Sequence, residues 1–278
     1  MIFNNKNLSF KIPKVMGILN VTPDSFSDGG AFKQLDAALR QTEQMLSQGA
    51  SFIDVGGEST RPGAQDVSEQ EELDRVIPII EAIHTRFDTI ISVDTSKAQV
   101  MTQAVNAGAS LINDVRALRE PNALAAAVAA NVPVCLMHMT GQPRSMQLAP
   151  DYNDVVKQVC DFLLKHIARC TDAGIPKTKI MIDPGFGFGK SLVHNYQLLN
   201  KLEDLHSLNL PILVGMSRKS MLGTALLRDV DDRLAGSIAV ATIAALKGVQ
   251  IIRVHDVKET IDAIKVVAML PKDNNNNE

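Results

Sequence analysis

Eight short apolar runs, rich in β-branched residues, recur along the chain and alternate with segments of helical periodicity. The predicted strands cover residues 14–20, 51–57, 89–95, 111–115, 132–138, 179–185, 211–217 and 249–255. Their apolar residues are nearly continuous, which is typical of parallel strands covered on both faces. Eight such units in about 250 residues predict an α/β fold, a single (β/α)₈ TIM barrel. A doubly wound open sheet is the alternative, but it usually has fewer strands and a glycine fingerprint at its switch point.

The ends of the chain differ from this repeating body. We assign residues 1–270 to one barrel domain, because no linker or shift in composition divides them. Residues 6–11 are expected to add a small strand pair beneath the barrel, as a short N-terminal strand extension. Residues 271–278 include four consecutive asparagines and too few apolar side chains to pack, so we predict a disordered tail. Between the strands, helical spacing predicts helices at 36–49, 69–86, 97–107, 121–130, 153–173, 198–206, 232–247 and 257–270.

Composition excludes several classes of function. The 278 residues carry a formal net charge of −3, which gives no overall basic field for nucleic acid. No apolar run reaches the ~18 residues that a membrane-spanning helix requires, and the first residues lack the apolar core of a signal peptide. Cys135, Cys160 and Cys170 form neither a C-x-x-C pair nor an even set, so we expect reduced thiols. A cytoplasmic protein without nucleic-acid or membrane partners is therefore predicted.

Polar side chains stand at or just past the C-terminal end of every predicted strand. They are Asn20, Asp54, Asp94, Asn113, Asp114, His138, Asp183, Ser217, Lys219, Arg253 and His255. In a barrel these ends converge on one mouth, where the active site lies. Any one of them is as easily a loop or helix cap as a ligand. So many buried polar groups are costly, however, unless they pair with each other or with a ligand, and we predict a site at the mouth.

The residue types at the mouth indicate the ligand. Asp94, Asn113 and Asp183 supply donors and acceptors suited to a flat, nitrogen-rich heterocycle. A local set of cations suits a diphosphate leaving group, because positive donors stabilise charge as it develops; this set comprises Arg61, Lys219, Arg253 and His255. Asn20 offers a neutral oxygen, adequate as a single protein ligand for Mg²⁺ whose other ligands are phosphates and water.

Two long loops flank this mouth, and a glycine-rich segment follows one of the strands. Residues 22–33 and 57–68 are rich in glycine, proline and small polar side chains, and we predict lids or ordinary surface turns there. The segment DPGFGFGK at 183–190 looks like a phosphate loop but has Pro184 where the P-loop pattern requires glycine. The dinucleotide fingerprint requires glycine where Lys190 stands, so nucleotide binding is rejected. Phe188 offers either a ring face to an aromatic substrate or simple packing.

Several motifs closely resemble those of the dihydropteroate synthases. They are MGILNVTPDSFSDGG at 16–30, IDVGGESTRPG at 53–63, SVDT at 92–95, IND at 112–114, DPGFGFGK at 183–190, GMSRKS at 215–220 and RVH at 253–255. They occur in the family's order and span nearly the whole chain. The resemblance implies an enzyme of folate biosynthesis that joins hydroxymethyl-dihydropterin diphosphate to para-aminobenzoate, giving 7,8-dihydropteroate and pyrophosphate.

The resemblance also implies a role for each matching residue. Asp94, Arg253, Lys219 and His255 would be catalytic. The pterin diphosphate would contact Thr60, Arg61, Asp94, Asn113, Asp183, Lys219, Arg253 and His255. The para-aminobenzoate position, which sulfonamides occupy in the family, would be lined by Phe26, Arg61, Pro62, Phe188 and Ser220. Asn20 would bind Mg²⁺ as the cofactor, and the family's dimers imply a homodimer here.

Two other functions remain open at this point. A pterin-binding methyltransferase barrel would explain the pterin contacts equally well, but not the cations or the loop at Arg61-Pro62. A non-catalytic pterin-binding paralogue would have no need of a complete cationic set. The sequence has no obvious nucleophile–base pair, so a dissociative, Mg²⁺-assisted loss of pyrophosphate is the mechanism that we expect.

Overall fold

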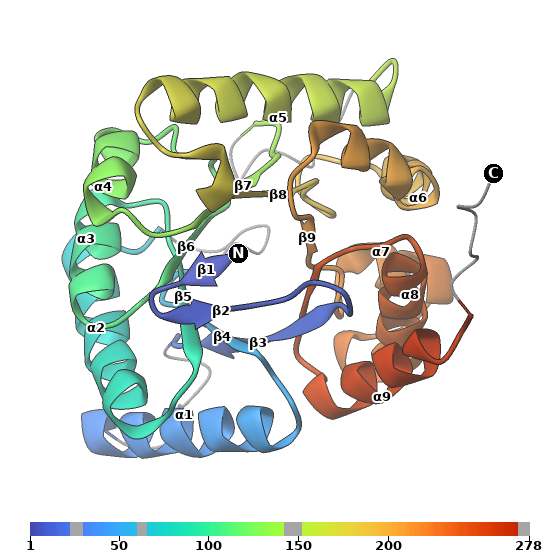
Figure 1. Ribbon diagram of the computed structural model, residues 1–278. Helices are drawn as coiled ribbons and strands as arrows, with labels where there is room; N and C mark the ends of the chain where they lie inside the picture. The colour runs from blue at the N-terminus through green and yellow to red at the C-terminus, as the bar shows by residue number, and fades with distance from the viewer. Residues whose placement is uncertain (23–29, 60–65, 142–151, 272–278) are drawn as a thin grey trace.

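Eight parallel strands form a closed ring, so the predicted (β/α)₈ barrel is confirmed (Figure 1). A computed structural model describes residues 1–22, 30–59, 66–141 and 152–271. The sheet order is β8-β7-β6-β5-β4-β3-β10-β9, and a parallel bridge between Ile182 and Ile212 joins its two edges. The strands are β3 (Lys14–Asn20), β4 (Phe52–Gly56), β5 (Ile90–Asp94), β6 (Leu111–Asp114), β7 (Val134–Met137), β8 (Ile180–Asp183), β9 (Leu213–Val214) and β10 (Ile251–Val254).

Helices surround the strands and cover their outer faces (Figure 1). They are α1 (Gly30–Ser47), α2 (Glu69–Arg86), α3 (Ala98–Asn106), α4 (Ala123–Ala130), α5 (Val155–Asp172), α6 (Leu192–Asn200), α7 (Ser220–Leu226), α8 (Leu234–Leu246) and α9 (Val257–Ala268). Short 3₁₀ turns occur at η2 (Lys177–Lys179), η3 (Leu202–Leu208) and η4 (Val230–Asp232). Across the described residues, none of these helices combines the length and apolarity needed to span a membrane.

The N-terminal end of the barrel is filled by apolar side chains, one from each strand. They are Met16, Phe52, Ile90, Leu111, Cys135, Met181, Leu213 and Ile251. A hairpin of β1 (Ile2–Phe3) and β2 (Lys6–Asn7) lies beneath them and buries Phe3 against Phe52, with ring centroids 5.1 Å apart. The predicted strand pair therefore exists, but it begins at Ile2 and ends before residue 11, so its expected position was too far along the chain. Ligands can reach the barrel interior only from the opposite end.

Between β8 and α8, one predicted helix lies at other bounds and one helix was not predicted. The helix expected at 198–206 begins at Leu192, because the Ser191 hydroxyl accepts a hydrogen bond from the His194 backbone and His194 accepts one from Ser191 in return. The chain then continues as the 3₁₀ turn η3, and the short helix α7 was not predicted. Of the predicted tail, residues 272–278 lie outside the described part of the chain.

Candidate active site at the barrel mouth

The alternation of side chains along each strand decides which polar groups enter the barrel. Side chains two residues apart share a face of a strand, and the apolar floor fixes which face points inward. Two residues beyond the floor, five of the eight inward positions are polar, namely Asp54, Ser92, Asn113, Asp183 and Arg253, whereas the other three hold Ile18, Met137 and Gly215. One further step reaches Asn20, Asp94 and His255 at the mouth. The barrel thus changes from an apolar floor to a polar interior within one strand step.

Arg253 lies at the centre of this polar interior. Its Nε donates to Asp54 Oδ2 at 2.6 Å, and its Nη2 donates to Asp94 Oδ2 at 2.7 Å. The Arg253 side chain is 18% exposed and Asp54 is fully buried. Burial alone would lower the pKa of Arg253, but the two carboxylates hold it above its usual value. Arg253 therefore remains a cation inside the barrel and holds two acidic side chains in fixed positions.

Asp94 is the carboxylate nearest the mouth in this group. Burial raises the pKa of Asp94 to about 7, despite the opposing charge of Arg253, and the negative charges of Asp54 and Glu72 add to the rise. Asn113 donates to Asp54 Oδ2 at 3.2 Å, which directs its amide oxygen away from that carboxylate. The group therefore presents a carboxyl that can gain or lose a proton near neutral pH, beside a free amide acceptor.

Asp183 and Lys219 form the opposite wall. Asp183 Oδ1 accepts from the Gly185 backbone at 2.7 Å, and burial raises the pKa of Asp183 although Lys219 opposes this. Lys219 Nζ donates to the Phe186 carbonyl at 2.6 Å and lies 4.5 Å from the centre of the Phe188 ring. Burial lowers the pKa of Lys219 to about 8, with Asp183 opposing the shift. An aromatic ring and an ammonium thus stand together on this wall.

A histidine follows β10 at the same end of the barrel. His255 Nδ1 lies 3.0 Å from Ser217 Oγ, and the His255 backbone donates to the same hydroxyl at 3.2 Å. Ser220 begins α7 and is exposed at the mouth. Acidic and amide groups in the interior, with cations around them, can bind a flat heterocycle inside and an anionic group near the rim.

Comparisons with known proteins agree with this geometry. The model of a pterin-binding enzyme family matches residues 16–255. The chain belongs to the pterin-binding enzyme family. It is 57% identical to the dihydropteroate synthase of Escherichia coli over 94% of this chain and 93% of that protein. The Yersinia pestis dihydropteroate synthase, solved with a sulfonamide drug, has a TM-score of 0.93 and 58% identity, covering 96% of this chain and 98% of the other. A Xanthomonas albilineans dihydropteroate synthase, solved with 4-aminobenzoic acid, has a TM-score of 0.91 and 48% identity. The match covers 97% of this chain and 98% of the other.

Not every predicted residue of this pterin-binding enzyme can be placed. The structure brings together Asp94, Asn113, Asp183, Lys219 and Arg253, as expected. Asn20 is half-buried at the end of β3, in register with Gly56 and, one strand further, with Asp94. Phe26, Thr60, Arg61 and Pro62 lie outside the described residues, as do most of the two predicted lids.

No role was predicted from the sequence for Asp54 or Ser217. Asp54 is fully buried and contacts both Arg253 and Asn113, and Ser217 orients His255. Both stand at polar strand ends, so the signal was present. Their role depends on pairing between strands distant in sequence, which the strand ends alone do not specify.

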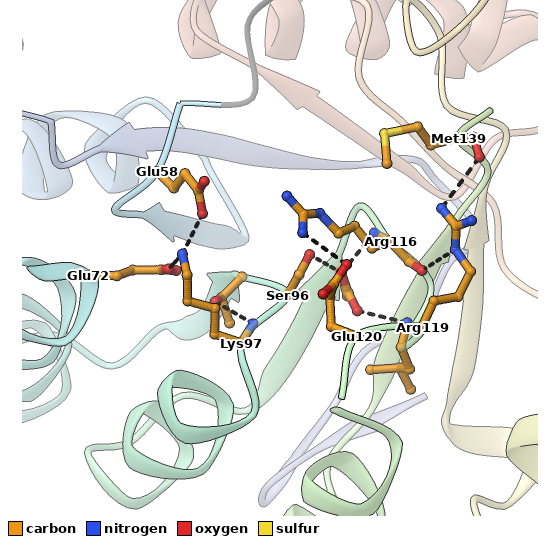
Figure 2. Close-up of polar contacts among 11 residues, drawn as sticks. Glu58, Glu72, Ser96, Lys97, Arg116, Arg119, Glu120 and Met139 are labelled. Atoms are coloured by element: carbon orange, nitrogen blue, oxygen red, sulfur yellow. Dashed lines mark hydrogen bonds and ion pairs between the residues drawn. The ribbon is translucent and has the colours of Figure 1, made fainter. Parts of the chain in front are cut away.

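A second polar cluster lies on the rim, between α2 and α3. Lys97 Nζ contacts Glu58 Oε2 at 2.5 Å and also contacts the fully buried Glu72 (Figure 2). Next to it, Ser96 donates to Asp114, which also accepts from the Arg116 backbone at 2.8 Å. These contacts tie the residues that follow β4, β5 and β6 to one another. In this pterin-binding enzyme they connect neighbouring strand ends beside the site.

Proposed function

We infer that this chain is a dihydropteroate synthase, which joins hydroxymethyl-dihydropterin diphosphate to para-aminobenzoate and releases pyrophosphate. The observation that carries the inference is the arrangement of Asp94, Asn113, Asp183, Lys219 and Arg253 inside the barrel, in a chain 57% identical to the E. coli synthase over almost its full length. The relatives reported above are dihydropteroate synthases, so they give no support to a methyltransferase barrel or a non-catalytic paralogue.

The proposed pterin contacts follow from the donors and acceptors of the interior. A pterin has one edge of alternating amide and amine groups, which requires both kinds of partner. Asp94 and Asp183 would accept from its N–H groups, and Asn113 would accept or donate through its amide. Lys219 would donate to a ring atom after leaving the Phe186 carbonyl, with Thr60 contacting the same substrate. Burial of these groups is consistent with a ligand that completes their hydrogen bonds.

Mg²⁺ is proposed as the cofactor that accompanies the diphosphate. The described residues contain no group of three or more His, Cys, Asp or Glu side chains able to hold a metal ion. Asn20 offers one neutral oxygen at the mouth, which fits an ion whose other ligands are phosphate oxygens and water. Bound there, Mg²⁺ would neutralise part of the charge on the leaving pyrophosphate.

The protein's own cations would support the departure of pyrophosphate. Arg253, His255 and Arg61 would attract the diphosphate oxygens as the bond between the pterin methylene carbon and oxygen breaks and its electron pair leaves with pyrophosphate. Asp94 would stabilise the positive charge that this leaves on the pterin. The amine nitrogen of para-aminobenzoate then bonds to the methylene carbon and loses a proton. No residue needs to act as a nucleophile.

The aryl amine would occupy the rim of the mouth. Phe188 and Ser220 are proposed to line this position, with Phe26, Arg61 and Pro62 completing the pocket. Phe188 offers a ring against which an aromatic amine can pack. Sulfonamides resemble para-aminobenzoate in shape, and the Yersinia pestis relative was solved with such a drug. We therefore propose that sulfonamides compete for this pocket.

Pyrophosphate release tests the function directly. The protein is mixed with hydroxymethyl-dihydropterin diphosphate and Mg²⁺, with and without para-aminobenzoate, and the pterin product is identified by mass. Release accompanied by dihydropteroate supports the synthase. Some release before amine is added supports the dissociative order of steps. Pterin binding without release would refute the activity.

A homodimer is proposed on the basis of one apolar surface. Large exposed hydrophobic side chains gather on α7, α8 and the end of α9, which lie together on one side of the barrel (Figure 1). Leu227 is 89% exposed and Met269 is 83% exposed. Light scattering on the wild type and on Leu227→Glu tests this: a dimer that the substitution weakens is expected, and a monomeric wild type would refute it.

A cytoplasmic location is proposed on the basis of the thiols. Cys135, Cys160 and Cys170 are free, and two of them are buried. Free cysteines are usual in a reducing compartment. Fractionation of cells that express the protein would test the location.

A further inference from the structure

Lys190 is a buried lysine that the proposed mechanism does not use. It ends the DPGFGFGK segment, at the position where a dinucleotide fingerprint would have glycine, and it is only 2% exposed. Its side chain contacts protein groups on three sides. Nζ donates to the Gly185 carbonyl at 2.7 Å and to the Phe188 carbonyl at 3.2 Å, and lies 2.9 Å from His138 Nδ1.

The hydrogen bonds of Lys190 are complete. An ammonium group has three N–H donors, and three acceptors surround this one. Burial lowers the pKa of His138 to about 2, and the charge of Lys190 adds to the shift, so the imidazole is neutral and Nδ1 can accept. Burial also lowers the pKa of Lys190 to about 7, although Asp183 opposes this. In its protonated form, Lys190 therefore has one acceptor for each of its three donors.

Backbone and side-chain groups both hold the segment that Lys190 contacts. Among the described residues, Phe188 donates to the Gly185 carbonyl at 3.2 Å, and several side chains add further contacts. Asn195 accepts from the Gly187 backbone at 2.7 Å, and Tyr152 donates to the Gly189 carbonyl at 2.8 Å. Gly185 has a φ of +69°, and a Cβ there would lie 1.9 Å from the His138 carbonyl. The segment is thus pressed against the residues after β7 and shaped by side chains, among which Lys190 binds two carbonyls.

This shape reaches the site through two short connections. The Gly185 residue whose carbonyl Lys190 binds also donates its backbone N–H to Asp183. The Phe186 carbonyl receives Lys219, which lies over the Phe188 ring. A shift of the segment would therefore move an acidic and a cationic partner of the pterin together.

We propose that Lys190 is a positioning residue, which, with His138, holds residues 185–188 in the conformation that presents Asp183 and Lys219 to the pterin. The inference rests on the proposed function, because it takes the pterin as the ligand of Asp183. It assigns Lys190 no contact with substrate.

The test is the affinity for 6-hydroxymethylpterin, measured by titration calorimetry without para-aminobenzoate. Lys190→Met keeps the length of the side chain and removes its donors. Its dissociation constant is expected to rise roughly 10- to 100-fold, the scale of losing hydrogen bonds from a charged group. The matched control is Lys179→Met at the other end of β8, where Nζ contacts Asn131; its affinity is expected to stay within about twofold of wild type.

A second pair of variants separates positioning from loss of stability. His138→Leu removes the acceptor and should weaken binding roughly 3- to 10-fold, whereas His138→Asn keeps an oxygen near the position of Nδ1 and should restore most of it. If Lys190→Met does not fold, the two His138 variants test the positioning role instead. Wild-type affinity in folded Lys190→Met, or equal losses in both His138 variants, would overturn the proposal. Absence of pterin binding by the wild-type protein would refute the proposed function instead.

Discussion

Replacing Arg253 with methionine should damage stability and catalysis in different ways. Methionine fills much of the same space but leaves Asp54 and Asp94 without their shared cation. Asp54 is fully buried and Asp94 is only 12% exposed, so water cannot replace the lost partner. Removing one member of a buried ion pair typically costs about 3–5 kcal/mol. Loss of one preorganised charge donor should lower kcat/KM by roughly 10²–10³.

The stability loss should depend on pH. Asp94 has a pKa of about 7 even though Arg253 opposes the rise, so removing Arg253 raises the folded-state pKa further above the unfolded value of about 3.9. A carboxyl with a raised folded-state pKa destabilises the fold wherever it must ionise. The deficit is therefore expected to be largest above pH 7 and to shrink as the pH falls through 7, below which the Asp94 carboxyl is protonated in the folded state with or without Arg253.

Urea unfolding followed by circular dichroism measures the deficit, since the chain contains no tryptophan. The wild type and Arg253→Met are compared at pH 5.5 and pH 8, together with Arg253→Met/Asp54→Asn, which removes one of the stranded charges. The double variant should recover stability at pH 8 without recovering pyrophosphate release. A deficit that is independent of pH, or a double variant no more stable than the single one, would refute this account of the ion pair.

Other substitutions test separate parts of the structure. Lys219→Met should raise the dissociation constant for 6-hydroxymethylpterin about tenfold at pH 7. Because the pKa of Lys219 is about 8, the wild-type affinity should fall as the pH rises through 8. The variant lacks this titrating group, so its affinity should not show that fall. A wild-type affinity that is flat from pH 7 to 9 would contradict this. Phe3→Ala should lower the free energy of unfolding by about 3–5 kcal/mol while leaving kcat at 25 °C near wild type, and a matched loss of kcat would link the floor to the mouth. Chelation of Mg²⁺ should reduce pyrophosphate release, and Asn20→Ala should raise the Mg²⁺ concentration needed for half-maximal rate; an unchanged requirement would remove Asn20 from the metal site.

The barrel could be predicted because its strands carry a strong local signal. Residues 14–20 form β3 with the predicted bounds, and the other seven strands lie within their predicted ranges. Helices with weaker signals were harder to predict. The helix α7 has only seven residues, and its Gly223 permits close approach of Arg233, since a Cβ there would lie 2.2 Å from the guanidinium. Such a contact is made by the tertiary fold, so the local sequence favours a loop.

The sequence predicted which residues form the candidate site better than it predicted which of them contact one another. Each polar residue at a strand end can be recognised alone. Arg253 contacts Asp54 and Asp94, which precede it by 199 and 159 residues, and that pairing depends on the order and register of the strands. Lys190 shows the same limit: the sequence could exclude a nucleotide loop, but only the packing of its segment against His138 reveals what the lysine does.

The filled floor of the barrel has a kinetic consequence. Phe3 and eight strand residues fill the N-terminal end of the barrel. Both substrates and both products must therefore pass through the opening at the other end. The ligand that lies deepest must then enter first and leave last. Arrival of the pterin should precede that of the aryl amine, and an aryl amine bound at the rim of an empty barrel would obstruct the pterin's route. Inhibition by excess para-aminobenzoate is therefore expected if both substrates enter through this one opening.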